Sequence, residues 1–261
     1  MSELNSGKEI NGKEREEERW DDRTRRLIGD NGVARLASAR VLVVGVGGVG
    51  GYVVEMLARS GIGFLTLMDA DCVSVSNLNR QLIALRDDIG KSKVSMFAER
   101  IRQINPDCVV EQREEFLTEE GVEELVGPGK FDIVIDAIDT VAPKVALIAY
   151  CLRNHIPILS SMGAGGRLDA TKVGITDLWK TENDGLARAV RQRLKKLGLK
   201  RPLKVASSTE VPRATSLIEL DQQNKRSSYG TIATIPALFG LHLASEALNL
   251  LLKEPKTQSH Q

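Results

Sequence analysis

The fold of this chain is decided by residues 41–50, VLVVGVGGVG, an apolar run that enters a glycine-rich turn. A short apolar run that ends at glycine predicts a buried strand, and the apolar spacing of residues 49–60 predicts a helix directly after it. The turn fits the pattern G-x-G-x-x-G, in which missing side chains let backbone amides approach a phosphate at the positive end of the helix. Its glycines are Gly45, Gly47, Gly48 and Gly50.

An acidic residue completes this pattern. The next predicted strand, residues 64–69, ends in Asp69, which lies 19 residues beyond Gly50. A carboxylate at this place can accept hydrogen bonds from the hydroxyl groups of a ribose. Tight packing of a helix on a strand also demands glycines, and the glycines alone would favour a nicotinamide or flavin cofactor. Strand, turn, helix and acid in register predict a nucleotide, without saying which one.

Strands and helices alternate along the rest of the chain. We expect strands at residues 108–112, 131–137 and 156–160, helices at 91–104, 118–126 (capped by Thr118), 143–154 and 236–252, and a glycine turn at 163–166. This order predicts an α/β fold: a Rossmann-like, doubly wound, mostly parallel sheet with helices on both faces. We expect one domain with a C-terminal extension, residues 19–253, between a flexible charged tail (1–18) and a second tail (254–261).

The bulk composition excludes several classes of protein. Lys and Arg total 36 against 35 for Asp and Glu, so the net charge offers no argument for a nucleic-acid or membrane partner. The three cysteines are far apart and form no C-x-x-C pair, so they imply neither a disulfide framework nor a zinc site, and a cytoplasmic setting is favoured. No stretch reaches the roughly 18 apolar residues of a membrane span, so we expect no membrane contact.

A polar loop follows Asp69, where a hydride-transfer enzyme needs little more than its ribose-binding acid. Asn77, Arg80 and Gln81 can donate hydrogen bonds to phosphate oxygens, and Lys93 adds a positive charge at the same end of the sheet. Asp71 completes the set of nucleotide-binding candidates. This composition favours ATP over NAD.

Two carboxylates flank the end of the strand at 131–137. Asp136 or Asp139 could hold a Mg²⁺ ion that bridges phosphates, because ligands of open α/β sheets collect at the carboxyl ends of the strands. The alternative is structural: Asp136 would cap a turn, and Asp139 would be the N-cap of the next helix.

These motifs, in this order, resemble the adenylation signature of the ubiquitin-activating-enzyme-like superfamily. The resemblance implies that Asp69 binds the ribose, that Asn77, Arg80 and Lys93 bind the phosphates, and that Asp139 binds Mg²⁺. It also implies a homodimer in which Arg26, from the basic stretch 23–27, reaches the neighbouring protomer's site. The catalytic residues would be Arg26, Arg80, Lys93 and Asp139. The alternative for residues 23–27 is a solvated helix face.

Within this superfamily, residues 101–106, 144–151 and 163–166 resemble the tRNA threonylcarbamoyladenosine dehydratases. The resemblance implies an ATP-dependent enzyme that adenylates the carboxylate of N6-threonylcarbamoyladenosine in tRNA and cyclises it with net dehydration, releasing AMP and pyrophosphate. The runner-up is an adenylyltransferase that activates the C-terminal glycine of a ubiquitin-like or sulfur-carrier protein. A nicotinamide-dependent oxidoreductase and a non-catalytic tRNA-binding scaffold are further alternatives.

A basic stripe supports an RNA substrate. Residues 188–204, within a segment (182–206) that we expect to be mobile, contain no Asp or Glu. The stripe could neutralise RNA phosphates, although a solvated surface helix would show similar charges. Its basic residues are Arg188, Arg191, Arg193, Lys195, Lys196, Lys200, Arg201 and Lys204.

The cysteines offer no catalytic residue. Some relatives place a cysteine just before the position of Gly230, and this chain has none there, so sulfur relay through that position is not supported; a sulfur-transfer or desulfurase-linked partner protein stays an open alternative. We interpret Cys72 as a small buried thiol and Cys108 and Cys151 as core residues. No catalytic base is assigned.

Overall fold

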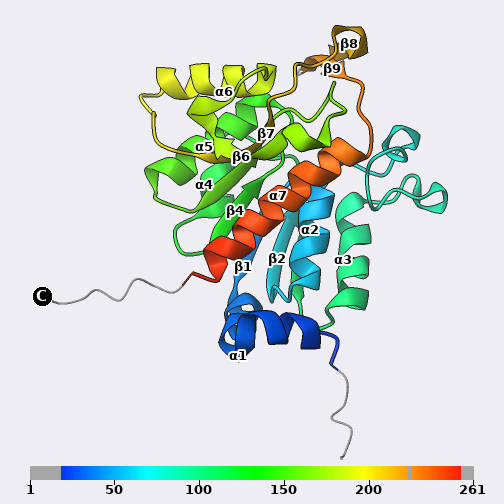
Figure 1. The fold of residues 1–261 in the computed structure, drawn as a ribbon, viewed down its shortest axis with the longest axis vertical. Helices are drawn as coiled ribbons and strands as arrows, with labels where there is room; N and C mark the ends of the chain where they lie inside the picture. Colours follow the sequence, from blue (N-terminus) through cyan, green and yellow to red (C-terminus); the bar gives the residue numbers. More distant parts are fainter. Residues whose placement is uncertain (1–18, 223–224, 254–261) are drawn as a thin grey trace, which may run out of the picture.

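A seven-stranded sheet forms the centre of the computed structural model, which describes residues 19–253 apart from 223 and 224 (Figure 1). The two predicted tails, 1–18 and 254–261, lie outside the described residues. The strand order is β3-β2-β1-β4-β5-β7-β6, and every neighbouring pair is parallel except β6 with β7. The strands are β1 (Arg40–Val44), β2 (Phe64–Met68), β3 (Val109–Arg113), β4 (Ile133–Asp136), β5 (Ile158–Ser161), β6 (Val173–Asp177) and β7 (Lys204–Ser208).

The order of the strands reverses beside β1, which pairs with β2 on one side and with β4 on the other. In open α/β sheets, ligands bind outside the carboxyl ends of the strands at such a reversal. The glycine turn follows β1, so the fold places it at this point. The prediction of a doubly wound, mostly parallel sheet is confirmed.

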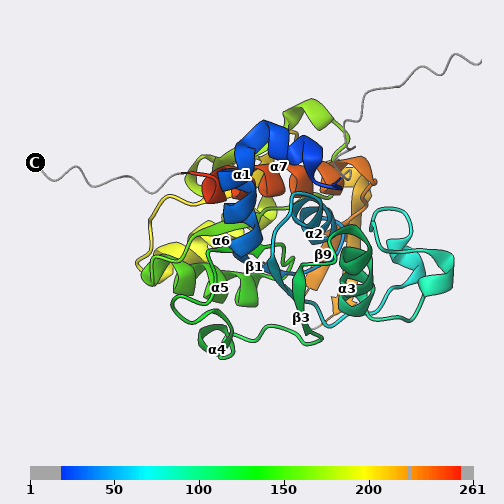
Figure 2. The ribbon, with the colours of Figure 1, turned by 90° about the horizontal axis from the view of Figure 1, so that it is seen from below.

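Helices cover both faces of the sheet (Figure 2). Successive residues of β1 alternate between two apolar cores, with Val41 and Val43 in one and Leu42 and Val44 in the other. The first core includes α2, α3 and α7, and the second includes α4, α5 and α6. The helices are α1 (Asp22–Ser38), α2 (Gly50–Arg59), α3 (Lys93–Ile104), α4 (Val122–Val126), α5 (Val141–Arg153), α6 (Gly185–Lys196) and α7 (Thr234–Leu251).

Shorter elements complete the described chain. The last third contains more regular structure than the sequence predicted, because β6, α6 and β7 extend the sheet and its helical cover. A separate antiparallel hairpin joins β8 (Leu217–Gln222) to β9 (Lys225–Tyr229). The 3₁₀ turns are η1 (Val75–Asn77), η2 (Arg86–Asp88), η3 (Ala170–Lys172), η4 (Leu178–Lys180) and η5 (Ala214–Ser216).

The predicted helix at 118–126 is shorter than expected. Its helical part, α4, begins at Val122, because the hydroxyl of Thr118 accepts a hydrogen bond from the amide of Gly121 (3.1 Å) and so closes the turn before the helix. Thr118 therefore caps a turn and not α4.

Helix α7 packs on one face of the sheet. It runs from the glycine turn to helix α1. It begins beside the glycine turn, where Pro236 faces Gly48, and Leu252 just after its end accepts a hydrogen bond from Arg35 of α1 (2.9 Å). By length and composition α7 could cross a membrane, which corrects the expectation that no segment reaches this limit. Its residues Phe239 and Leu243 are buried in the first core, as expected of a core helix. The absence of membrane contact stays a prediction.

Candidate functional site

The glycines of the turn after β1 have two different roles. A Cβ atom on Gly50 would lie 1.8 Å from the carbonyl oxygen of Gly45, and one on Gly45, whose φ is +86°, would lie 2.9 Å from that of Ala137. These two glycines are required by backbone packing. Added Cβ atoms on Gly47 and Gly48 would meet side chains, those of Gln81, Arg80 and Pro236, at ordinary contact distances. Gly45 and Gly50 thus fit the explanation by tight packing, while Gly47 and Gly48 leave room for a phosphate to approach the backbone.

Asp69 lies directly behind this turn. One carboxylate oxygen accepts a hydrogen bond from the amide of Val46 (2.9 Å) and the other from the amide of Asp71 (2.9 Å). Because each carboxylate oxygen has two lone pairs, both can still accept from a ribose hydroxyl. The two amides hold the side chain in one orientation, beside the turn that would carry the phosphates.

Lys93, the first residue of α3, is almost completely buried at the same place. Its ammonium group lies 2.7 Å from a carboxylate oxygen of Asp71 and 3.9 Å from one of Asp69. A buried ammonium needs such partners, since leaving a charge unpaired away from water is costly. Asp71 therefore orients Lys93, a role that the sequence did not suggest for it.

The loop after Asp71 folds back over the glycine turn. The side-chain oxygen of Asn77 accepts from the amide of Ser74 (3.1 Å), and the guanidinium of Arg80 donates to the carbonyl of Ser76 (2.6 Å). Gln81 is buried against Gly47, and its side-chain oxygen has no hydrogen-bond partner within the described part of the chain. An unpaired buried polar atom is expensive, so it marks a place where a ligand group would bind.

The two carboxylates after β4 have different environments. Asp136 is completely buried; it accepts hydrogen bonds from the ammonium of Lys144 and the hydroxyl of Ser160, both at 2.6 Å, and from the amide of Ile138 (3.0 Å). It caps a turn, as the structural alternative predicted, and its ion pair leaves no role for it as a metal ligand. A lysine in the first turns of the mostly apolar α5 was the sequence signal for this pair.

Asp139 is exposed and lies after the carboxyl end of β4. The structural alternative, in which it is the N-cap of the next helix, is wrong, because Thr140 is the N-cap of α5. Within residues 19–253, as far as they are described, no group of three or more His, Cys, Asp or Glu side chains could hold a metal ion. Magnesium commonly uses only one or two carboxylates together with phosphates and water, so a single carboxylate at Asp139 fits that pattern.

Arg26 lies far from these residues. It is exposed on α1, which is interrupted at Gly29 (φ 71°) and contacts the far end of α7. Helix α7 rises about 24 Å between Pro236 and Leu252, from about 1.5 Å per residue. Figure 1 shows α1 at the end of the molecule opposite the β8–β9 hairpin. Arg26 therefore cannot reach the glycine turn of its own chain.

A surface hollow of about 640 Å³ lies beside this kink in α1. It is separated from the glycine turn by the length of α7, so it is not the nucleotide site. Its lining residues are Ile28, Gly29, Asp30, Asn31, Gly32, Arg35 and Leu252.

The basic stripe belongs mainly to α6, which packs on α5 through Ala187, Val190 and Leu194. Three of its eight predicted members form hydrogen bonds or an ion pair with other parts of the chain, and only Arg191 is partly buried. Arg191 donates to the carbonyls of Leu178 and Thr181, both at 3.1 Å. Arg201 donates to the carbonyl of Leu152, and Lys204 pairs with Glu246. All members except Arg191 are exposed: Arg188, Arg193, Lys195, Lys196, Lys200, Arg201 and Lys204.

The thiols differ from the prediction in one case. Cys72 is exposed, so its interpretation as a buried thiol was wrong. Cys151 is buried as predicted, whereas Cys108 is only partly so. Burial raises the pKa of Cys108 to about 11 and that of Cys151 to about 12, the latter with help from the negative charge of Asp136. Neither thiol is therefore a ready nucleophile near neutral pH.

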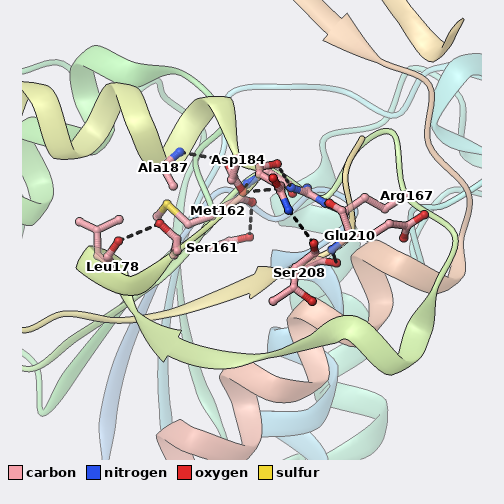
Figure 3. Close-up of polar contacts among 12 residues, drawn as sticks. Ser161, Met162, Arg167, Leu178, Asp184, Ala187, Ser208 and Glu210 are labelled. Carbon is pink, nitrogen blue, oxygen red and sulfur yellow. Dashed lines mark hydrogen bonds and ion pairs between the residues drawn. The ribbon is translucent and has the colours of Figure 1, made fainter. Parts of the chain in front are cut away.

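Sequence reasoning missed a second polar cluster, at the ends of β5 and β7. It is centred on Arg167 and Asp184, which are buried and paired (3.5 Å) (Figure 3). The arginine directly after the predicted glycine turn and the aspartate before α6 were the available signals.

Comparison with known proteins gives a consistent result. The sequence model of the ThiF family matches residues 22–261. A tRNA threonylcarbamoyladenosine dehydratase of Haemophilus influenzae is 40% identical over 88% of this chain and 92% of its own length. The protein of that name from Escherichia coli K12 is 51% identical over 66% of this chain, an alignment that spans 64% of the relative. A structure of the E. coli dehydratase in complex with ATP has a TM-score of 0.80 and 42% identity, covering 88% of this chain and 92% of the other.

Proposed function

This chain belongs to the tRNA threonylcarbamoyladenosine dehydratases of the ThiF family, and on that premise we propose that it uses ATP to adenylate the carboxylate of N6-threonylcarbamoyladenosine in tRNA and then cyclises that group. The observation that carries the proposal is the match to the E. coli dehydratase whose structure contains ATP, at 42% identity and a TM-score of 0.80. The match covers 88% of this chain.

The carboxyl edge of β1 and β2 fits a nucleotide. Asp69 is held by two backbone amides with lone pairs to spare, and Gly47 and Gly48 present backbone without side chains beside Gln81 and Arg80. The unpaired oxygen of Gln81 would accept a hydrogen bond from a hydroxyl or amino group of the nucleotide, while its NH2 group could donate to a phosphate oxygen. Lys93, already oriented by Asp71, would place its remaining donors on phosphate oxygens.

The chemistry requires activation of a poor electrophile. One oxygen of the substrate carboxylate attacks the α-phosphorus of ATP and pyrophosphate leaves, which gives an acyl-adenylate. An internal nitrogen or oxygen of the modified nucleoside then attacks the acyl carbon, a proton is lost and AMP leaves with the former carboxylate oxygen. The tRNA has lost one water. Arg80 and Lys93 would stabilise the charge that develops on the phosphates, as preorganised donors commonly do.

Magnesium would be held by Asp139, whose position after β4 places its carboxylate at the same edge as the glycine turn. When bound, the ion would neutralise phosphate charge. The chain's own contribution would be to fix Asp139, and the buried Asp136 does so indirectly: its second carboxylate oxygen holds the amide of Ile138, the residue before Asp139.

The active unit would be a homodimer. Arg26 lies at the opposite end of α7 from the glycine turn of its own chain, so its role in the reaction would be in the site of a partner protomer. A monomer would then bind ATP and release no AMP.

The tRNA would contact the exposed face of α6. Arg188, Arg193, Lys195 and Lys196 point away from the face that packs on α5 and lie within three turns of one helix. Cations gathered in this way neutralise RNA phosphates and make binding depend on salt.

Mass spectrometry tests the proposal directly. Incubation of threonylcarbamoyl-tRNA with the protein, ATP and Mg²⁺ should lower the mass of the modified nucleoside by one water and release one AMP for each event. Arg80→Ala and Asp139→Ala should remove both signals while folding and dimerisation are retained. An unchanged nucleoside mass with every tRNA tried would contradict the proposal, and ATP–pyrophosphate exchange that requires a small carrier protein would identify the alternative adenylyltransferase.

A further inference from the structure

Arg167 joins three loops that are far apart in the sequence. Its guanidinium donates to the carbonyls of Gly163, Asn183 (2.9 Å) and Glu210 (3.3 Å), and it lies 3.5 Å from a carboxylate oxygen of Asp184. A planar guanidinium carries five donor hydrogens in fixed directions, so it can hold several acceptors at once. The side chains of Arg167 and Asp184 are each only 1% exposed.

Asp184 makes the second half of this connection. One of its carboxylate oxygens accepts from the amide of Ala187 (2.9 Å) and so caps α6, while the other accepts from the amide of Gly163 (2.9 Å). Figure 3 shows Asp184 between the first turn of α6 and the side of Arg167. A Cβ atom on Gly163 would lie 3.3 Å from a carboxylate oxygen of Asp184, so a side chain here would press on this contact.

These contacts link the basic helix to the carboxyl edge of the sheet. Gly163 follows β5 and Glu210 follows β7, and both strands run parallel to β4, after which Asp139 lies. Ser160 of β5 is also bonded to Asp136 of β4. A continuous set of contacts therefore runs from the turn that carries Asp139, across β4 and β5, to the N-terminus of α6.

Stability alone is a poor reason for such a pair. Replacing a buried ion pair with apolar residues of similar size is often neutral or stabilising. Arg167 illustrates the cost, since its burial lowers its pKa against the opposing effect of Asp184. What the pair adds is a defined orientation of α6.

We propose that Arg167 and Asp184 are positioning residues that fix α6, and the tRNA bound on it, relative to the site of adenylation. This inference rests on the proposed function. The basic side chains of α6 supply affinity for RNA, and the Arg167–Asp184 pair sets where the bound carboxylate lies with respect to the α-phosphate. A small displacement of a reacting group is costly for the rate even when binding persists.

The variant Asp184→Asn isolates this role. Asparagine is as good an N-cap as aspartate, so its oxygen can still cap α6, but the NH2 group that then faces the amide of Gly163 and the guanidinium of Arg167 cannot accept a hydrogen bond from either. We expect the single-turnover rate at saturating tRNA to fall by about tenfold or more, with half-saturation by tRNA changed by less than about threefold, because reaction geometry is lost and the surface charges remain. ATP affinity, measured without tRNA, should stay at the wild-type value.

Asp177→Asn is the matched control. Asp177 also caps a helical turn, through the amide of Trp179 (2.8 Å), and its second oxygen also accepts from a distant amide, that of Leu203 (3.1 Å). It lies at the opposite edge of the sheet, since it ends the antiparallel β6 beside the start of β7. It should lose the same kinds of hydrogen bond without the loss of rate.

Three outcomes decide the question. A slow Asp184→Asn beside a fast Asp177→Asn supports positioning, whereas a wild-type rate in Asp184→Asn, or an equal loss in both variants, overturns it. If Asp184→Asn does not fold, Arg167→Lys replaces it, because lysine keeps the charge and cannot span the three loops; a wild-type rate in that variant overturns the inference. Failure of the proposed function is separate, since it would appear as no loss of water with the wild-type protein.

Discussion

The buried ion pair between Lys144 and Asp136 allows a quantitative prediction for Lys144→Met. Both side chains are completely buried, and methionine preserves most of the volume of the lysine stem. Removing one partner of a buried pair costs about 3–5 kcal/mol, because the remaining charge is left without its partner. Asp136 would keep its bonds from Ser160 and Ile138, which places the expected loss near the lower end, about 3 kcal/mol by the same rule.

Urea unfolding and a thermal scan measure this loss. A domain of this size loses about 2–4 °C for each kcal/mol, so the melting temperature should fall by about 6–12 °C. Lys172→Met is the matched control: Lys172 pairs with Asp169 at 3.5 Å on the surface, where an ion pair is worth less than about 1 kcal/mol. The double variant Lys144→Met with Asp136→Asn should recover part of the stability, since no charge is left unpaired.

Two results would refute this reasoning. If Lys144→Met were no less stable than Lys172→Met, the buried pair would contribute nothing. If the double variant were as unstable as the single one, the loss would come from packing and not from an uncompensated carboxylate.

Three further predictions concern the reaction. Arg26→Ala and Arg80→Ala protomers, mixed in equal amounts and allowed to exchange, should recover about a quarter of the wild-type activity. About half of the dimers are then mixed, and each mixed dimer of a two-fold assembly has one complete site out of two. No recovery would exclude an arginine supplied by the partner. Replacement of Arg193, Lys195 and Lys196 by glutamine should weaken tRNA binding and reduce the slope of log affinity against log salt by about 2–3, from about 0.7–0.9 for each phosphate contact; an unchanged slope measured by filter binding would remove α6 from the RNA surface. Alkylation at neutral pH should modify Cys72 first, since burial raises the pKa of both other thiols, and bound ATP should slow it because Cys72 adjoins Asp71; fast labelling that survives in Cys72→Ser would show the assignment to be wrong.

Local sequence patterns predicted most of the fold and part of the candidate site. The apolar run before the glycine turn and the alternation of strand and helix signals depend on neighbouring residues, and β1, β2 and α2 lie where these signals predicted them. Asp69 was also predictable, because its place after β2 follows from strand order alone. The structure supports an exposed Asp139 at the carboxyl edge, although its role stays a proposal.

The sequence could not predict which side chains pair when they lie far apart in the chain. Arg191 has the same charge and spacing as its neighbours on α6, yet its guanidinium donates hydrogen bonds to the carbonyl groups of Leu178 and Thr181. Asp136 and Asp139 look alike in sequence, and only one of them meets a buried lysine. The carboxylate of Asp71 forms an ion pair with the ammonium group of Lys93. In each case the deciding partner lies 8 or more residues away and reaches the side chain only after the chain has folded.

The distinction has a simple physical origin. Backbone conformation and the choice of buried face depend on residues within a few positions of each other, so they can be read from the chain in order. The function of a charged side chain depends on which other charges and dipoles surround it and on how much water remains. Those surroundings are assembled from several strands and helices at once, which is why the separation of Arg26 from the glycine turn and the joining of three loops by Arg167 became visible only in the folded molecule.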